Sequence, residues 1–121
     1  MKVKRVKIGI KSVKEVLEGF AKTAEAIERG EKVKKETGVY FTSLEAFRKA
    51  LTPKRFELLH IIKTKKPHSI NHLARLAKRD LTNVADDLKY LEQVGLVEKQ
   101  EHDREIRPFI KYDRIDLQIA V

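Results

Sequence analysis

The residues of this chain best suited to specific chemistry lie on the segment DLTNVADDLKYLEQVGLVEK, residues 80–99. Asn83 could form a bidentate pair with N6 and N7 of adenine, and Lys89 lies on the same polar face. That face also carries Asp86 and Asp87, two carboxylates that a phosphate backbone repels unless they are paired. The segment therefore indicates either a helix that enters a DNA groove or an amphipathic helix whose charges face water.

A second set of chemical residues is formed by His68 and His72, whose spacing of four allows two imidazoles on one helix to bind a metal. Ser69 is the predicted cap of that helix, so His68 falls outside it, and no convincing third ligand follows. The sequence also lacks a Ser/His/Asp grouping, a catalytic pair of carboxylates and a glycine-rich phosphate loop. We therefore expect surface histidines, no metal, no cofactor and no enzymatic activity.

The overall composition predicts a globular chain with an anionic partner. Its 121 residues suffice for one domain with a modest core, and 41% of them are hydrophobic. The formal net charge of +9 favours nucleic acid first, an acidic protein second and anionic lipid third, although a solvated basic surface is the simpler alternative. The absence of cysteine agrees with a reducing compartment. With no apolar run long enough for a membrane and no secretory signal, we expect a cytoplasmic protein.

We expect an N-terminal unit over residues 1–51, with 13 Lys/Arg against 7 Asp/Glu. Residues 3–10 alternate like a strand with one wet face. A helix follows, capped by Ser12 and ended by Gly30, with an apolar stripe that covers the chain's own core, forms a homodimer or binds another protein. The stripe consists of Val13, Val16, Leu17, Phe20, Ala24 and Ile27.

The rest of this unit is less regular. Residues 31–38 are polar and read as a linker or exposed turn, and residues 39–41 as a short buried strand. Thr42 and Glu45 have the spacing of a capping box, which predicts a short helix over residues 43–51. Its inward side chains should be Leu44, Phe47 and Leu51.

A second unit, residues 52–121, is predicted to run helix, helix, tight turn, helix, hairpin and strand. Thr52 and Pro53 mark the start of its first helix, whose core stripe includes Phe56 and Leu59. Ser69 should cap the second helix and Thr82 the third, which Gly95 ends. Residues 96–100 and 106–112 form the hairpin, in which Pro108 requires an edge position. The final strand, 114–120, should pair with residues 3–10, within one chain or between two.

This order, on the residues LTPKRFELLHIIKTKKPHSINHLARLAKRDLTNVADDLKYLEQVGLVEK, resembles winged helix-turn-helix transcriptional regulators of the MarR/ArsR type. Within that group it is most similar to small DNA-binding proteins of archaea and bacteria, some of them antitoxins paired with a toxin. The most specific parts are LTPKR, the RD before the last helix and the GLVEK after it. The resemblance implies an α+β fold with a recognition helix and a wing.

The resemblance also implies a set of DNA-contacting positions. At the helix that would enter the major groove, these are its exposed N-terminal residues; at the wing they are basic side chains; and at the second helix a hydroxyl would hold a phosphate. The positions are Ser69, Lys78, Arg79, Thr82, Asn83, Ala85, Asp86, Lys89, Lys99, Arg104 and Arg107.

One position departs from this pattern. Many relatives carry a basic residue where this chain has Asp86. Asp86 could accept from N4 of cytosine, pair with Lys89 or Tyr90, or simply face solvent. Asp87 can be explained as a partner of Arg79 or Arg55 that holds the turn.

Two functions follow as expectations. The first is a sequence-specific regulator of double-stranded DNA, a homodimeric repressor of its own or a neighbouring operon. The second is an antitoxin or protein-interaction module that binds an acidic toxin through its N-terminal half. The two can coexist in one protein.

Overall fold

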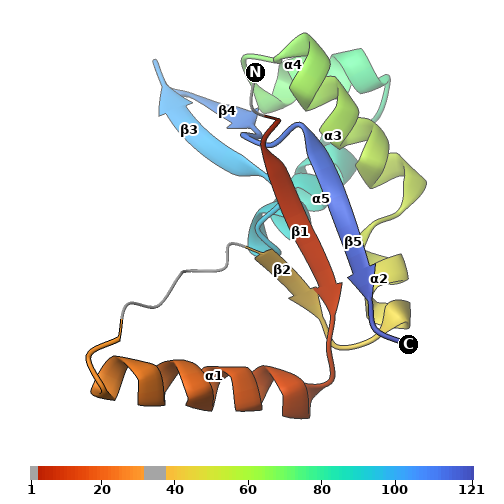
Figure 1. Ribbon diagram of the computed structural model, residues 1–121. Coiled ribbons are helices and arrows are strands. Elements are labelled where there is room, and N and C mark those ends of the chain that lie inside the picture. Colours follow the sequence, from red (N-terminus) through yellow and green to blue (C-terminus); the bar gives the residue numbers. More distant parts are fainter. Residues whose placement is uncertain (1–2, 32–37) are drawn as a thin grey trace.

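The computed structural model describes residues 3–31 and 38–121, and Figure 1 shows its arrangement. Within these residues the fold is α+β, as predicted, and no helix has both the length and the apolar character needed to cross a membrane. The elements are β1 (Arg5–Ile10), α1 (Val13–Glu28), β2 (Gly38–Phe41), α2 (Leu44–Ala50), α3 (Pro53–Lys65), α4 (Ile70–Ala77), α5 (Leu81–Gln93), β3 (Glu98–His102), β4 (Glu105–Phe109) and β5 (Arg114–Ile119).

A three-stranded parallel sheet joins the two ends of the chain. Its strand order is β2-β1-β5, and Ile8 of β1 lies opposite Val39 on one side and Leu117 on the other. The predicted pairing of the first and last strands is therefore confirmed, and it occurs within one chain. Strands from both predicted units share this sheet, so the units 1–51 and 52–121 are joined by backbone hydrogen bonds.

Asp113 fixes the point at which β1 and β5 begin side by side. Its carboxylate accepts from the backbone N–H of Lys4 at 2.9 Å, and its own N–H donates to the Lys4 carbonyl at 2.6 Å. Lys63 of α3 adds an ion pair at 2.8 Å. The hydrogen bond from Lys63, followed by the one from Lys4, lowers the pKa of the Asp113 carboxyl. This cluster ties the sheet to the helical layer.

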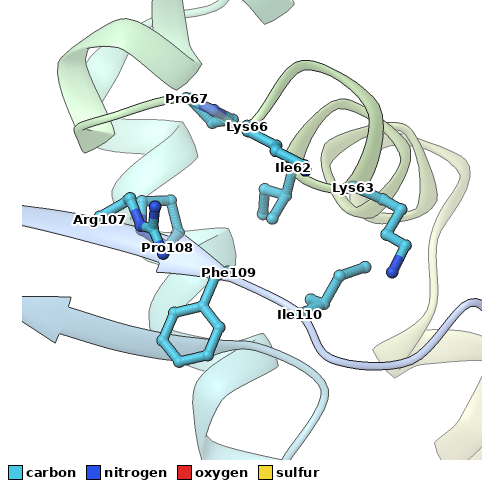
Figure 2. Close-up of a pocket in the computed structure, with 8 residues that line it drawn as sticks. All are labelled: Ile62, Lys63, Lys66, Pro67, Arg107, Pro108, Phe109 and Ile110. Atoms are coloured by element: carbon cyan, nitrogen blue, oxygen red, sulfur yellow. The ribbon is translucent and has the colours of Figure 1, made fainter. Parts of the chain in front are cut away.

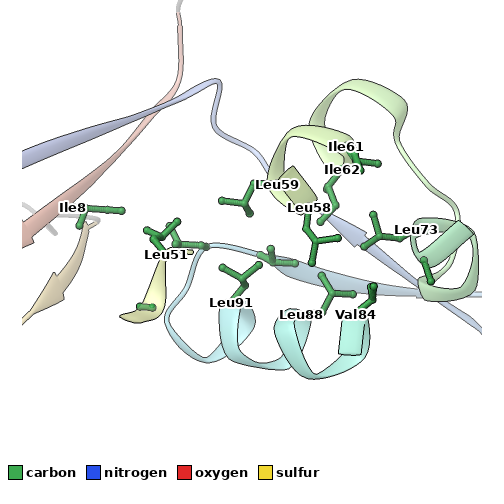
Figure 3. Packing of buried hydrophobic residues seen from close by; sticks show 14 of the residues in the cluster. Ile8, Leu51, Leu58, Leu59, Ile61, Ile62, Leu73, Val84, Leu88 and Leu91 are labelled. Carbon is green, nitrogen blue, oxygen red and sulfur yellow. The ribbon is translucent and has the colours of Figure 1, made fainter. Parts of the chain in front are cut away.

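The core lies between the sheet and helices α3, α4 and α5 (Figure 3). Ile8 supplies a fully buried side chain from the sheet, while α5 supplies Leu88 and Leu91. Two inward predictions are wrong, because Leu44 is 48% and Phe56 is 44% exposed. The buried side of α3 consists of Leu58, Leu59, Ile61 and Ile62, so the predicted inward position of Leu59 is confirmed.

The error at α3 has a physical reason. Apolar residues occupy positions 56, 58, 59, 61 and 62, so they surround too much of the helix for periodicity to select one face. The packing against α4 and β4 makes the selection, and it turns Phe56 outward.

Most helix ends follow the predicted local signals. The Thr52 hydroxyl accepts from the N–H of Arg55, and Pro53 takes the first helical position. Gly95 has φ +88°, and the N–H of Leu96 reaches back to the Leu91 carbonyl to close α5.

Two predicted caps are wrong. Ser43, rather than Thr42, caps α2 by accepting from the N–H of Ala46. Asp80, rather than Thr82, caps α5. The carboxylate of Asp80 accepts from the backbone N–H groups of Thr82 and Asn83, whereas Thr82 itself lies inside the helix.

Helix α1 stands apart from this core, as Figure 1 shows. It is capped by Ser12 and ended at Gly30, as predicted, and the N–H of Glu31 closes its last turn on the Ala26 carbonyl. None of its residues is buried, so its apolar stripe does not cover the chain's own core. Residues 32–37 of the predicted linker lie outside the described residues.

Two leucines of α5 give a matched test of this packing. Leu88 is fully buried, whereas Leu81 is 43% exposed at the start of the same helix. Leu88→Ala should lower the free energy of unfolding by about 2–5 kcal/mol because it leaves a cavity. Leu81→Ala should change it by less than about 1 kcal/mol. Urea denaturation followed by circular dichroism measures both, and equal losses would contradict this core.

Candidate nucleic-acid interface

A three-residue turn joins α4 to α5. Lys78 adopts a left-handed conformation with φ +54°, and the N–H of Arg79 returns to the Ala74 carbonyl. Asp80 then caps α5. The turn KRD predicted from the sequence is confirmed, and it leaves no freedom for α5 to change its direction relative to α4 without breaking these bonds.

Asp87 of α5 stabilises this turn through ion pairs. Its carboxylate binds Arg79 at 2.7 Å through one oxygen and Arg55 at 3.1 Å through the other. The sequence predicted Arg79 or Arg55 as the partner of Asp87, and in the structure Asp87 binds both. All three side chains are 17–18% exposed, so solvent weakens the two ion pairs only in part.

Arg55 extends the same network to α2. Its Nη1 donates to the carbonyls of Lys49 and Ala50 at 3.2 and 2.8 Å, which lie at the end of that helix. Its guanidinium also lies over the ring of Tyr90 at 4.2 Å. Asp87 therefore connects the ends of α2 and α4, the start of α3 and the middle of α5.

The charge state of Asp87 follows from these contacts. Burial acts to raise the pKa of its carboxyl, but the hydrogen bonds and charges of Arg79 and Arg55 outweigh it, so the pKa is lowered. The carboxylate is ionised at neutral pH and cancels part of the charge of its two partners.

The solvent-facing side of α5 is open. Val84, Leu88 and Leu91 point into the core, while Asn83 and Asp86 lie on the exposed side. Asp86 has no hydrogen bond or ion pair within the described part of the chain, so the predicted pairing with Lys89 or Tyr90 is not formed. Six predicted DNA contacts are exposed and have side chains without a hydrogen bond or ion pair among the described residues: Lys78, Thr82, Asn83, Asp86, Lys89 and Arg104.

The hairpin of β3 and β4 places Arg104 at its tip. Asp103 and Arg104 have φ of +48° and +67°, the geometry of a tight two-residue turn between twisted strands. Lys99 is bound to Glu92 of α5 at 2.8 Å, and Arg107 donates to Gln100 at 3.2 Å. These two predicted contacts are partly engaged in fixing the hairpin.

The base of the hairpin packs on α3. Figure 2 shows Pro108 and Ile110 facing Ile62 across a small cavity of about 270 Å³, with Lys66 and Arg107 at its margin. Pro108 is buried, and its place in a two-stranded hairpin satisfies the predicted need for an edge strand.

Three predicted contacts are less accessible. Ser69 is only 8% exposed, and its hydroxyl oxygen accepts from the N–H of His72 to cap α4, so burial limits the access of a phosphate to this side chain. Arg79 is bound to Asp87, and Ala85 is half-buried. Sequence reasoning also missed Asp80, although an aspartate immediately before an apolar-periodic segment is itself a cap signal.

The two histidines stack on each other with ring centroids 4.2 Å apart, and His68 lies 3.5 Å from Glu105. The backbone N–H of His68 donates to Nδ1 of His72, which uses a lone pair that a metal would need. Among residues 3–31 and 38–121, no group of three His, Asp or Glu side chains is placed to hold a metal ion.

A family model named HVO_A0114 matches residues 50–117, which is more than half of the chain. The chain belongs to the HVO_A0114 family. No curated protein matches it. The part shared with HVO_A0114 runs from the end of α2 through the hairpin and most of β5, so it includes the Asp87 network and the open face of α5. Helix α1 and strands β1 and β2 lie outside the matched part.

Neighbouring aspartates allow a controlled test of the network. Asp87→Ala leaves two half-buried guanidinium groups without their partner and should lower the free energy of unfolding by about 3 kcal/mol. Asp86→Ala removes an exposed carboxylate with no partner and should change it by less than about 0.5 kcal/mol. Urea denaturation at neutral pH measures both, and similar values for the two variants would contradict the role given to Asp87.

The same network predicts a pH dependence. Because the folded-state pKa of Asp87 lies below the unfolded value of 3.8, its contribution is complete above that pH and is lost as the pH falls through the lowered pKa. Asp87→Asn mimics the protonated form. Wild type should therefore be more stable than Asp87→Asn at pH 7, and this difference in the free energy of unfolding should narrow as the pH falls from 3.8 to the lowered pKa. Denaturation curves over this pH range test this, and a gap independent of pH would count against it.

Proposed function

We propose that the protein is a sequence-specific double-stranded DNA-binding regulator of the winged helix-turn-helix type, acting as a homodimeric repressor without enzymatic activity. The observation that carries this proposal is the open face of α5, which follows a three-residue turn braced by Asp87. A rigid turn and an exposed helix are what groove entry requires. The likeness to MarR/ArsR regulators supports the same function.

In this proposal the first turns of α5 read bases. Thr82 and Asn83 are exposed, and Asp80 accepts hydrogen bonds from the backbone N–H groups of both residues. Asn83 can pair with adenine through N6 and N7, a contact worth about 1–3 kcal/mol of discrimination. Lys89 lies farther along the same face and can reach the backbone of the groove.

The hairpin acts as the wing. Arg104 at its tip and Lys78 in the turn contact phosphates, and these contacts strengthen binding to every sequence alike. The Lys99–Glu92 ion pair holds the hairpin to α5, so that the wing and the reading helix are positioned as one body.

The two aspartates of α5 have different roles. Asp87 is neutralised by Arg55 and Arg79 on the inner side of the helix, so it does not repel the DNA backbone directly. Asp86 remains exposed and unpaired within the described residues, which suits an acceptor for N4 of cytosine. We propose that Asp86 adds specificity at the cost of affinity.

The rival proposal, an antitoxin that binds an acidic protein through the N-terminal half, draws support from the exposed stripe of α1. The charge of α1 argues against it: the helix carries four glutamates and two lysines, although the chain as a whole is basic. An acidic partner would find repulsion on this helix rather than attraction.

Selection of bound duplexes from a random library, followed by titration of the selected duplex, tests the proposal. Asn83→Ala should lower the preference for the selected sequence by at least tenfold while weak general binding remains. Arg104→Ala should weaken binding to all sequences and reduce the slope of log K against log salt by about 1.

Arg48 on α2 supplies the control, since it is exposed and basic but lies on a different element from the proposed interface. Arg48→Ala should leave both the preference and the salt slope close to wild type. Selection that enriches no sequence, or equal losses for Asn83→Ala and Arg48→Ala, would defeat the assignment of α5 as the reading helix.

A further inference from the structure

Helix α1 presents a large apolar surface to solvent. Phe20 is 77% exposed, Leu17 64%, Ile27 62% and Val13 59%, and no residue of the helix is buried. Contiguous exposed apolar side chains on one helix face mark an interaction surface. A helix of 16 residues is about 24 Å long, so the surface has the shape of a stripe.

The order of residues along the stripe is symmetric. Val13, Phe20 and Ile27 are spaced by seven, the repeat of two helices packed side by side. Val16 and Ala24 lie between them at equal distances in sequence from Phe20. Apart from Leu17, whose counterpart about Phe20 is Thr23, the apolar pattern is the same from either end, so an antiparallel copy would place Phe20 on Phe20 and Val13 on Ile27.

The residues beside the stripe indicate the direction in which a second copy of α1 would pair with the first. Lys14, Ala21 and Glu28 are also spaced by seven and lie beside the stripe, with a base at one end, a small residue in the middle and an acid at the other. An antiparallel copy brings Lys14 of each helix beside Glu28 of the other. In a parallel copy these two charges stay at opposite ends of the pair and make no contact.

We propose that α1 pairs antiparallel with α1 of a second copy of this chain, centred on Phe20. The opposed dipoles of the two helices favour the same direction. This arrangement supplies the interface of the homodimer in the proposed function. Its biological role rests on that function, whereas the pairing of the two helices does not. The tests below contain no DNA, so they can fail without deciding DNA binding.

The mass of the full chain in solution is the first measurement. Analytical ultracentrifugation should give a dimer of about twice the 14.1 kDa chain mass. Phe20→Ser should give a monomer, whereas Lys22→Ser, on the opposite side of the same helix, should remain dimeric. Because no residue of α1 is buried, thermal unfolding of the core should be the same in both variants. A monomeric wild type, or a dimer that persists in Phe20→Ser, overturns the proposal.

Direction is tested by cross-linking, because the chain has no cysteine of its own. A mixture of Val13→Cys and Ile27→Cys chains should form a disulfide-linked heterodimer on mild oxidation, while each variant alone should cross-link poorly. Lys22→Cys should not cross-link. Efficient cross-linking of Val13→Cys with itself would show a parallel pair and overturn the antiparallel assignment.

Discussion

The interaction on which the proposed interface depends is the pair of ion pairs at Asp87. One carboxylate binds Arg79 in the turn before α5 and Arg55 at the start of α3, and Arg55 in turn binds the carbonyls that end α2. Three helix ends and the middle of α5 are thereby connected by three side chains. Asn83 lies one turn before Asp87 on α5, so its direction depends on this arrangement and on Leu88, which anchors the same helix in the core.

Helix caps and stops were predicted well because they depend on hydrogen bonds between residues that are close together in the sequence. The caps at Ser12 and Thr52 and the stop at Gly95 depend on hydrogen bonds to residues within five positions in the chain, and all three are confirmed. The partners of Asp87 were also predicted, since a carboxylate on a helix beside a basic turn requires a cation. The error at Thr82 arose because Asp80, two residues earlier, can also cap, and the structure places Asp80 just before the helix and Thr82 within its first turn.

Non-local features were predicted less well. The pairing of the first and last strands was expected from their one-sided patterns, but their parallel direction and the place of β2 beside β1 depend on how the chain returns across the sheet. Burial of Ser69 and the outward turn of Phe56 are decided by neighbours far away in sequence. The same holds for Arg79, whose basic character suggested a phosphate contact although Asp87 occupies it.

The central claim is that the open face of α5 is the surface that meets DNA. Titration of ¹⁵N-labelled protein with a selected duplex, followed by NMR, tests it most directly. The account predicts that amide shifts concentrate over residues 81–89 and at the hairpin tip around Arg104, while α2 and the sheet change little. Shifts confined to α1 or to the strands β1 and β5, with α5 unaffected, would contradict the account.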